Sequence, residues 1–179
     1  MKITSTTISG VYTLEIEPVH DNRGFFARTF CMDELGKAGL VTSFPQCNVS
    51  YNAKKATLRG MHYQIAPFGE TKIVRCTSGS VYDVVVDIRP SSPTFKKWYG
   101  VELSFENRRS IYIPEGIAHG FISLVDGAEL LYMMSAKYQP EAARGVRWND
   151  PAFAIEWPLT PSVIADRDNT FSGFSSSQT

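Results

Sequence analysis

Short extended segments separated by turn residues dominate this sequence. From Gln46 to Tyr138 apolar and polar residues alternate in short runs, and Gly, Pro, Asn or Asp falls between nearly all of them. We predict strands at residues 47–51, 57–64, 71–77, 81–88, 99–104, 110–113, 118–124 and 129–138. Many short strands with hardly any helix indicate a closed or double-sheet antiparallel fold.

The N-terminal quarter adds two expected strands and one helix. Alternation predicts strands at residues 6–19 and 24–30, and the segment 32–38 is the one convincing helix signal, with Gly39 placed to cap its C-terminus. The length of 179 residues fits one domain, which we place at residues 1–171. The Ser-rich segment 172–179 is expected to be a flexible tail.

The segment 81–88 favours a barrel with a polar cavity over a dry sandwich. Strand alternation puts Asp83, Val85 and Asp87 on one face, so carboxylates share that face with valine. A barrel whose interior binds a polar ligand explains this pattern, although a solvent-exposed face would produce it too. The fold class predicted is therefore all-β: a cupin-like jelly-roll barrel with a few short helices.

Composition excludes several classes of protein. The 18 basic and 18 acidic residues cancel, so no global field favours nucleic acid or an anionic membrane. The apolar runs are too short to span a bilayer, and the N-terminus does not resemble a signal peptide. Three scattered cysteines contain no C-x-x-C pair and indicate reduced thiols. A soluble cytoplasmic protein is expected.

The segment Leu58 to Gln64 carries the first candidate for chemistry. Alternation places Gly60, His62 and Gln64 on one face of a strand and Met61 and Tyr63 on the other. His62 would thus point into the cavity as a titratable base, or it would be a structural histidine. Arg59 has the opposite parity, so it reaches the same cavity only if the strand bulges near Gly60.

A second histidine raises the question of a metal. His119 lies in the pattern P-x-G-x-x-H, which resembles the second metal motif of cupins. The first cupin motif requires H-x-H, and the corresponding segment here reads His62-Tyr63-Gln64. Because glutamine is a poor substitute for imidazole, we expect no metal site.

Several separated motifs follow one another in order over residues 10–168. They are Arg59-Gly60-Met61-His62-Tyr63-Gln64, Glu70-Thr71-Lys72, 84–89 with Ser92-Pro93-Thr94, 114–121, 129–132 and 144–151. Together these motifs resemble one family, that of dTDP-4-dehydrorhamnose 3,5-epimerase and its relatives. The resemblance implies an isomerase of deoxysugar and cell-surface polysaccharide biosynthesis that needs no cofactor, binds a nucleotide-diphosphate sugar and forms a homodimer.

The chemistry of such an epimerase assigns four catalytic roles. A 4-keto group acidifies the hydrogens at C3 and C5 of a hexose, so inversion needs a base, an acid and a group that stabilises the enolate oxygen. By resemblance His62 is the base, Asp168 orients it, Tyr132 is the acid, and Lys72 approaches the enolate oxygen.

Further residues match substrate-binding positions of the family. They are Arg23, Phe26, Arg28, Gln46, Asn48, Arg59, His119, Tyr138 and Arg167. Arg28 and Ala143 replace glutamates that are usual in the rhamnose-pathway enzymes, and Arg167 replaces a lysine. These changes concern ligand contact and leave open a CDP- or GDP-linked substrate with one centre inverted. A metal-dependent cupin and a non-catalytic sugar-binding module are the remaining alternatives.

Overall fold

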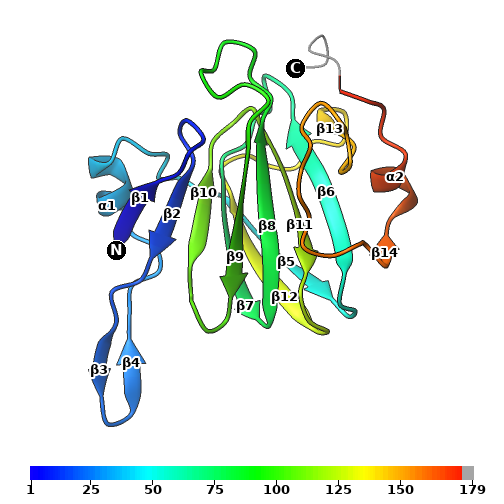
Figure 1. The fold of residues 1–179 in the computed structure, drawn as a ribbon. Coiled ribbons are helices and arrows are strands. Elements are labelled where there is room, and N and C mark those ends of the chain that lie inside the picture. The colour runs from blue at the N-terminus through cyan, green and yellow to red at the C-terminus, as the bar shows by residue number, and fades with distance from the viewer. Residues whose placement is uncertain (175–179) are drawn as a thin grey trace.

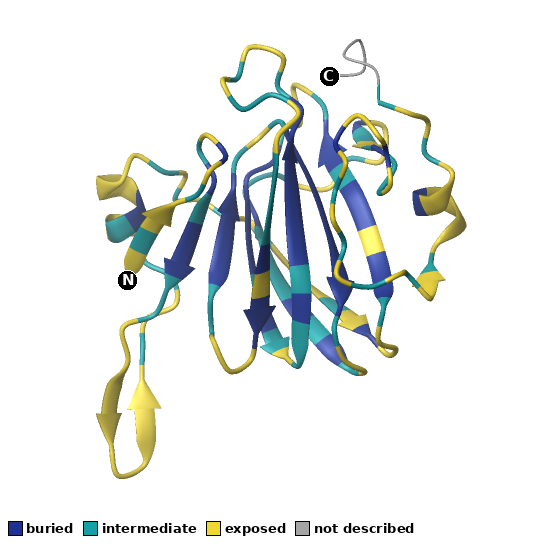
Figure 2. Cartoon of the chain, in the orientation of Figure 1, coloured by how far each residue is buried: buried dark blue, intermediate teal, exposed yellow. Residues whose placement is uncertain are grey.

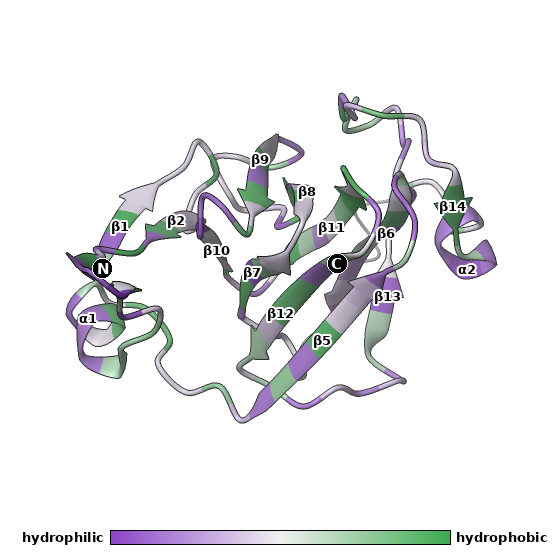
Figure 3. Ribbon diagram, turned by 90° about the horizontal axis from the view of Figure 1, so that it is seen from below, coloured by the Kyte–Doolittle hydropathy of each residue, from purple (hydrophilic) through white to green (hydrophobic). Residues whose placement is uncertain are grey.

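Two antiparallel sheets lie face to face and form a flattened barrel. Figure 1 shows the strands from the side, with the two sheets overlapping, and Figure 3 shows the two layers from below. The structure is a computed structural model that describes residues 1–174. Sheet I has the strand order β1 (Lys2–Ser5), β2 (Tyr12–Glu15), β10 (Ser110–Ile113), β7 (Lys72–Ser78), β12 (Ala128–Met134) and β5 (Gln46–Asn52). Sheet II has the order β13 (Ala143–Gly145), β6 (Thr57–Gln64), β11 (Ile117–Ser123), β8 (Ser80–Asp87) and β9 (Trp98–Ser104).

Smaller elements flank the two sheets. The strand β14 (Val163–Ile164) pairs in parallel with β6, and β3 (Val19–Asp21) and β4 (Gly24–Phe26) form a separate hairpin. The helices are α1 (Met32–Lys37) and α2 (Asp166–Asn169). No helix within residues 1–174 is long and apolar enough to span a membrane.

The predicted fold class is confirmed, and the strands from β5 to β12 were predicted to within one or two residues except at one end. The strand expected at 129–138 ends at Met134. The segments 6–19 and 24–30 contain only short strands, and β1, β3, β13, β14 and α2 were not predicted. Each of these unpredicted elements has two to four residues, too few to display a period.

The space between the sheets is apolar at one end and polar at the other. Val74 and Leu130 of sheet I pack there against Val85 and Phe121 of sheet II. Further along β7 the inward residue is Lys72, so the apolar core gives way to a polar cavity. Figure 2 shows how the buried residues concentrate on these central strands.

The expected parity of β8 is confirmed. Val84, Val86 and Ile88 pack on the outer face of sheet II, which the segment around Val146 and Phe153 covers. Asp83 is fully buried on the inner face, where it meets His119. The polar residues of this strand therefore belong to the interior and not to a solvated face.

Packing at the C-terminus extends past the expected domain end at residue 171. Phe174 packs against Phe153 with ring centroids 5.0 Å apart, and its N–H donates to Asp150 over 2.7 Å. Ser172 to Phe174 therefore follow the domain surface, while residues 175–179 of the expected tail lie outside the described residues.

Strand β6 bulges at Gly60. Such a bulge was the condition for the side chain of Arg59 to reach the cavity. His62 pairs with His119 and Arg59 with Phe121, so two residues of β6 face one residue of β11 between these pairs. Gly60 has φ +128°, and a Cβ there would lie 2.5 Å from the Cα of Gly120. Only glycine permits this close approach of the two backbones. Because of the bulge, Arg59 and His62 both line the cavity.

Substitution of Gly60 tests the importance of the bulge for stability. Gly60→Ala is expected to lower the free energy of unfolding by on the order of 3 kcal/mol or more, because it adds a backbone clash to a strained φ. Gly24→Ala is the matched control, since Gly24 has φ +130° with no atom within 4 Å of its added Cβ, and it should cost only about 1 kcal/mol. Equal losses in denaturant unfolding would contradict the close-packed bulge.

Candidate active site

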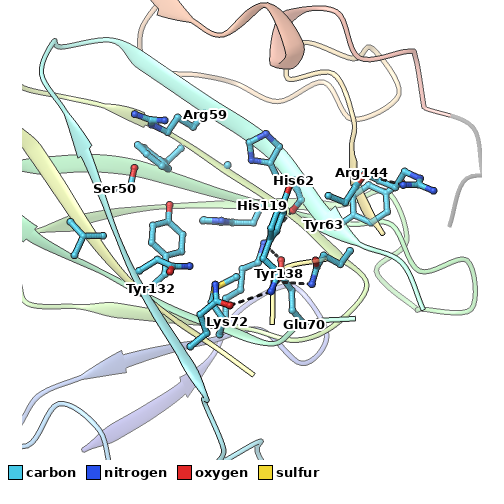
Figure 4. A pocket seen from close by; sticks show the side chains of 18 of the residues that line it. Ser50, Arg59, His62, Tyr63, Glu70, Lys72, His119, Tyr132, Tyr138 and Arg144 are labelled. Atoms are coloured by element: carbon cyan, nitrogen blue, oxygen red, sulfur yellow. Dashed lines mark hydrogen bonds and ion pairs between the residues drawn. The ribbon is translucent and has the colours of Figure 1, made fainter. Parts of the chain in front are cut away.

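A cavity of about 520 Å³ opens between the polar ends of the two sheets. Figure 4 shows its side chains converging from both sheets. Nine predicted site residues line it: Gln46, Asn48, Arg59, His62, Lys72, His119, Tyr132, Tyr138 and Arg167. Asp168 lies directly behind His62. The structure thus brings together residues that are as far as 121 positions apart, from Gln46 to Arg167.

His62 and Asp168 form a hydrogen-bonded dyad. The Nε2 atom of His62 lies 2.7 Å from Oδ1 of Asp168, and the backbone N–H of Gly60 donates to Oδ2 over 3.0 Å. Burial raises the pKa of the Asp168 carboxyl, but the hydrogen bonds from His62 and Gly60 outweigh it and hold the pKa below its ordinary value. The carboxylate therefore keeps the proton on Nε2, which leaves Nδ1 of His62 as the basic nitrogen.

Tyr132 faces His62 from the opposite sheet. It lies on β12 of sheet I, whereas His62 lies on β6 of sheet II, and Figure 4 shows the two side chains on different sides of the cavity. Burial of the hydroxyl, reinforced by the negative charge of Asp83, raises the pKa of Tyr132 well above its usual value of 10.0. Tyr132 is therefore a protonated phenol at neutral pH and can act as a proton donor.

A buried pair, Asp83 and His119, lies next to Tyr132. Nε2 of His119 is 2.8 Å from Oδ2 of Asp83, and the His119 ring meets the Tyr132 ring edge to face at a centroid distance of 5.9 Å. Burial raises the pKa of Asp83. The sequence interpretation noted Asp83 only as evidence for a polar interior. The available signal was that Asp83 is spaced by two and four residues from Val85 and Asp87, on a strand that neighbours the strand of His119.

Glu70 is a site residue that the sequence analysis did not assign. Its Oε1 atom forms an ion pair with Nζ of Lys72 at 2.9 Å, and both side chains are 7% exposed. Gln64 donates to Glu70 over 3.2 Å, and Lys72 approaches the carbonyl oxygen of His62 at 3.4 Å. Glu70 thus holds the Lys72 ammonium in the cavity, and its spacing of two residues from Lys72 was the available signal.

Three guanidinium groups surround the cavity. Arg59 donates to Asn52 and to the Tyr51 carbonyl, and Arg144 donates to two carbonyl oxygens of its own loop. Neither residue nor Arg167 forms an ion pair with a carboxylate within residues 1–174. Their charge is therefore available to an anionic ligand. Arg144 was not among the predicted site residues.

Three predicted binding residues do not line the cavity of their own chain. Arg23 and Phe26 lie on the projecting β3–β4 hairpin, where the Phe26 residue is 82% exposed, and Arg23 pairs with Asp21. Arg28 pairs with Glu34 of α1 at 2.7 Å. Strand alternation carried no information on where this hairpin would point, so sequence reasoning alone could not place these residues.

No metal-binding cluster is formed by the described part of the chain. Within residues 1–174, no group of three or more His, Cys, Asp or Glu side chains is placed to hold a metal ion. Each cavity histidine is instead engaged by one aspartate, His62 by Asp168 and His119 by Asp83. The arrangement suits proton transfer, with a base and an acid on facing sheets.

The chain matches a single family over nearly its whole length. Residues 5–176 match the family model described as dTDP-4-dehydrorhamnose 3,5-epimerase. The Shigella flexneri dTDP-4-dehydrorhamnose 3,5-epimerase is 44% identical over 169 residues, which cover 94% of this chain and 93% of that relative.

Solved structures of similar proteins share the fold. The crystal structure of dTDP-4-dehydrorhamnose 3,5-epimerase from Bacillus anthracis, with TDP and PPi bound, superposes with a TM-score of 0.93 at 39% identity and covers 97% of this chain and 99% of its own. ChmJ from Streptomyces bikiniensis, a 3'-monoepimerase in complex with dTDP-quinovose, gives a TM-score of 0.88 at 32% identity, with coverage of 95% and 86%.

Stability against pH tests the dyad without any substrate. A carboxyl whose pKa is lowered by folding stabilises the protein above its unfolded pKa, and this stabilisation is lost as pH falls through the folded pKa. Asp168→Asn should therefore lower the free energy of unfolding at pH 7 by about 1–3 kcal/mol, and the deficit should shrink below a pH of about 4.

Asp166→Asn in the same helix is the matched control. The Asp166 side chain is exposed and makes no ion pair among residues 1–174, so this variant should stay within about 0.5 kcal/mol of wild type. A deficit of Asp168→Asn that is the same at neutral and acidic pH would contradict the assigned dyad.

Proposed function

Because the chain belongs to the dTDP-4-dehydrorhamnose 3,5-epimerase family, we propose that it epimerises a nucleotide-linked 4-keto-6-deoxyhexose. Like its relatives, it is an isomerase of deoxysugar biosynthesis. The reaction inverts C3, C5 or both by removal and return of a proton. The observation that carries the proposal is the placement of a basic dyad and a phenol on facing sheets of one cavity.

Proton abstraction is assigned to His62. Its Nδ1 atom takes the hydrogen from the carbon next to the ketone, and the electron pair of the broken C–H bond delocalises into the carbonyl as an enolate. The carboxylate of Asp168, bound to Nε2, stabilises the imidazolium that forms. The dyad thereby supplies a base without a cofactor.

Inversion requires that the new proton arrive on the other face of the enolate. Tyr132 meets this requirement because it belongs to sheet I and remains protonated at neutral pH. After the transfer it is a buried phenolate, which the nearby Asp83 charge destabilises. The raised pKa of Tyr132 therefore favours prompt reprotonation of this residue and readies the site for a second centre.

The enolate oxygen is stabilised by Lys72. The ammonium is held in the cavity by Glu70 and stands near the His62 backbone, so a developing negative charge in the same cavity meets a fixed positive charge. The Glu70–Lys72 pair is buried before substrate binds, so the free-energy cost of burying the ammonium belongs to folding and not to catalysis.

The diphosphate of the substrate is assigned to the guanidinium groups of Arg59, Arg144 and Arg167. Each has donors without a carboxylate partner, and guanidinium groups bind phosphate oxygens in a bidentate manner. The B. anthracis relative has TDP and PPi bound, which supports a nucleotide diphosphate as the ligand. Gln46, Asn48 and His119 are left to contact the sugar, and the exposed Tyr138 to stack on the base.

The names of the relatives bear on the nucleotide and on the number of inverted centres. The curated relatives include both 3,5-epimerases and a 3-epimerase of Streptomyces niveus that is 37% identical. We propose dTDP as the nucleotide because the similar proteins are named for it. The changes at Arg28, Ala143 and Arg167 make CDP and GDP the comparison substrates.

A homodimer is proposed to complete the site. The β3–β4 hairpin projects from the barrel and exposes Val19, Phe25 and Phe26, and it carries Arg23. Of these residues, Arg23 and Phe26 match substrate-binding positions of the family, and neither lines the cavity of its own chain. A second copy that receives the hairpin would bury its apolar side chains and bring Arg23 and Phe26 to the rim of that copy's cavity.

Hydrogen exchange tests the proposed reaction. In deuterium oxide the protein is expected to label dTDP-4-keto-6-deoxyglucose at C3, C5 or both, with CDP and GDP analogues labelled more slowly. His62→Ala should lose about 10²- to 10⁴-fold in the labelling rate. Proton NMR measures both results, and absence of label in all three nucleotide sugars would sink the proposal.

Complementation tests the shared site. His62→Ala and a Phe26→Ala/Arg23→Ala variant should each be weakly active as homodimers. When they are mixed and refolded together, half of the dimers contain one intact barrel that receives an intact hairpin, so about a quarter of wild-type activity should return. Activity of the mixture that merely averages the two homodimers would contradict an exchanged hairpin.

A further inference from the structure

The strand partner of His62 is a glycine whose side-chain space is filled from elsewhere in the chain. Gly145 of β13 lies directly opposite His62 of β6. Side chains of directly paired residues stand on the same face of a sheet, so a side chain at Gly145 would stand beside the imidazole. A Cβ at Gly145 would instead lie 2.3 Å from two ring atoms of Phe171. The Phe171 ring therefore occupies this space.

Phe171 touches the base. Its ring centroid lies 6.0 Å from that of His62 with an interplanar angle of 76°, an edge-to-face arrangement. The Arg167 guanidinium lies over the same ring, 5.7 Å from its centroid. Within residues 1–174, the two ring partners of Phe171 are thus residues that line the cavity.

Phe174, three residues further along the same segment, serves as a comparison for Phe171. It packs against Phe153 and Phe95 in the apolar layer outside sheet II, away from His62. Phe171 belongs to none of the apolar clusters formed by the described residues. Its contacts serve the site, whereas those of Phe174 anchor the chain.

We propose that Phe171 is a positioning residue that holds the His62 ring in the orientation required for proton abstraction. The Asp168 hydrogen bond restrains His62 at Nε2 but leaves the ring free to tilt about that bond, and 41% of the His62 side chain is exposed. The edge contact with Phe171 supplies the second restraint. It also keeps bulk water from one side of the dyad, so that Nδ1 stays aimed at the substrate.

Gly145 follows from the same arrangement. Any larger residue at this position would displace Phe171 and remove the restraint on His62, although the Gly145 backbone itself has no φ that demands glycine. The two positions should therefore act as one unit in catalysis. This inference rests on the proposed function, and its test includes a measurement that does not.

Kinetics and a double-mutant cycle test the unit. Phe171→Ala and Gly145→Ala are each expected to lower kcat for hydrogen exchange by about 10- to 100-fold with KM within about threefold of wild type. The double variant should be no worse than either single variant, because the added Cβ has no ring to displace. Phe171→Leu, which keeps most of the bulk, should restore much of kcat.

Phe174→Ala is the matched control. It is expected to lower thermal stability at least as much as Phe171→Ala while keeping kcat near wild type at a temperature where both are folded. A kcat loss in Phe174→Ala equal to that of Phe171→Ala would overturn the proposal, as would additive losses in the double variant, because both results would mean general loosening of the C-terminal segment.

Imidazole NMR separates this inference from the proposed function. In the free protein, Phe171→Ala and Gly145→Ala should change the His62 ring shifts in the same direction, and Phe174→Ala should leave them at wild-type values. This result stands whether or not any nucleotide sugar is turned over. His62 signals unchanged in Phe171→Ala would overturn the positioning role.

Discussion

The close approach of β6 and β11 at Gly60 and Gly120 is the constraint on which the site depends. It creates the bulge that turns Arg59 to the same side as His62. The N–H of Gly60 that is freed from regular pairing donates to Asp168, so the bulge also anchors the hydrogen-bond partner of His62. One contact between two glycines thus positions both the residue proposed to bind phosphate, Arg59, and the residue proposed to remove the proton, His62.

The division of labour between the two sheets gives this geometry its chemical meaning. Sheet II carries His62, with Asp168 behind it, while sheet I carries Tyr132 and Lys72. The cavity between the sheets is therefore lined by a basic dyad on one side and by a phenol and an ammonium on the other. The C-terminal segment closes the arrangement, because α2 supplies Asp168 and the residues after it supply Phe171. The strands of the barrel thus form the cavity, and the C-terminal segment adds two residues that contact His62.

The sequence was sufficient where regular periods and turn residues decide structure. The strand at 57–64 was predicted with its observed bounds, and the inward facing of Asp83 was anticipated from alternation. It was insufficient where structure depends on contacts between distant segments. Asp168 was found only through the family resemblance, and Phe171 and Glu70 were not assigned because no periodic pattern marks a residue that fills another residue's space. The direction of the β3–β4 hairpin was hidden for the same reason.

His62 and Tyr132 are proposed to act on opposite faces of one enolate, and the stereochemistry of exchange in a Tyr132→Phe variant distinguishes their roles. Without the phenol, His62 still removes the hydrogen and returns one from solvent to the same face. We therefore predict that this variant in deuterium oxide incorporates label with retention of configuration and forms little inverted product. Inversion at the wild-type rate would show that the proton on the second face comes from another group and would contradict the proposed role of Tyr132.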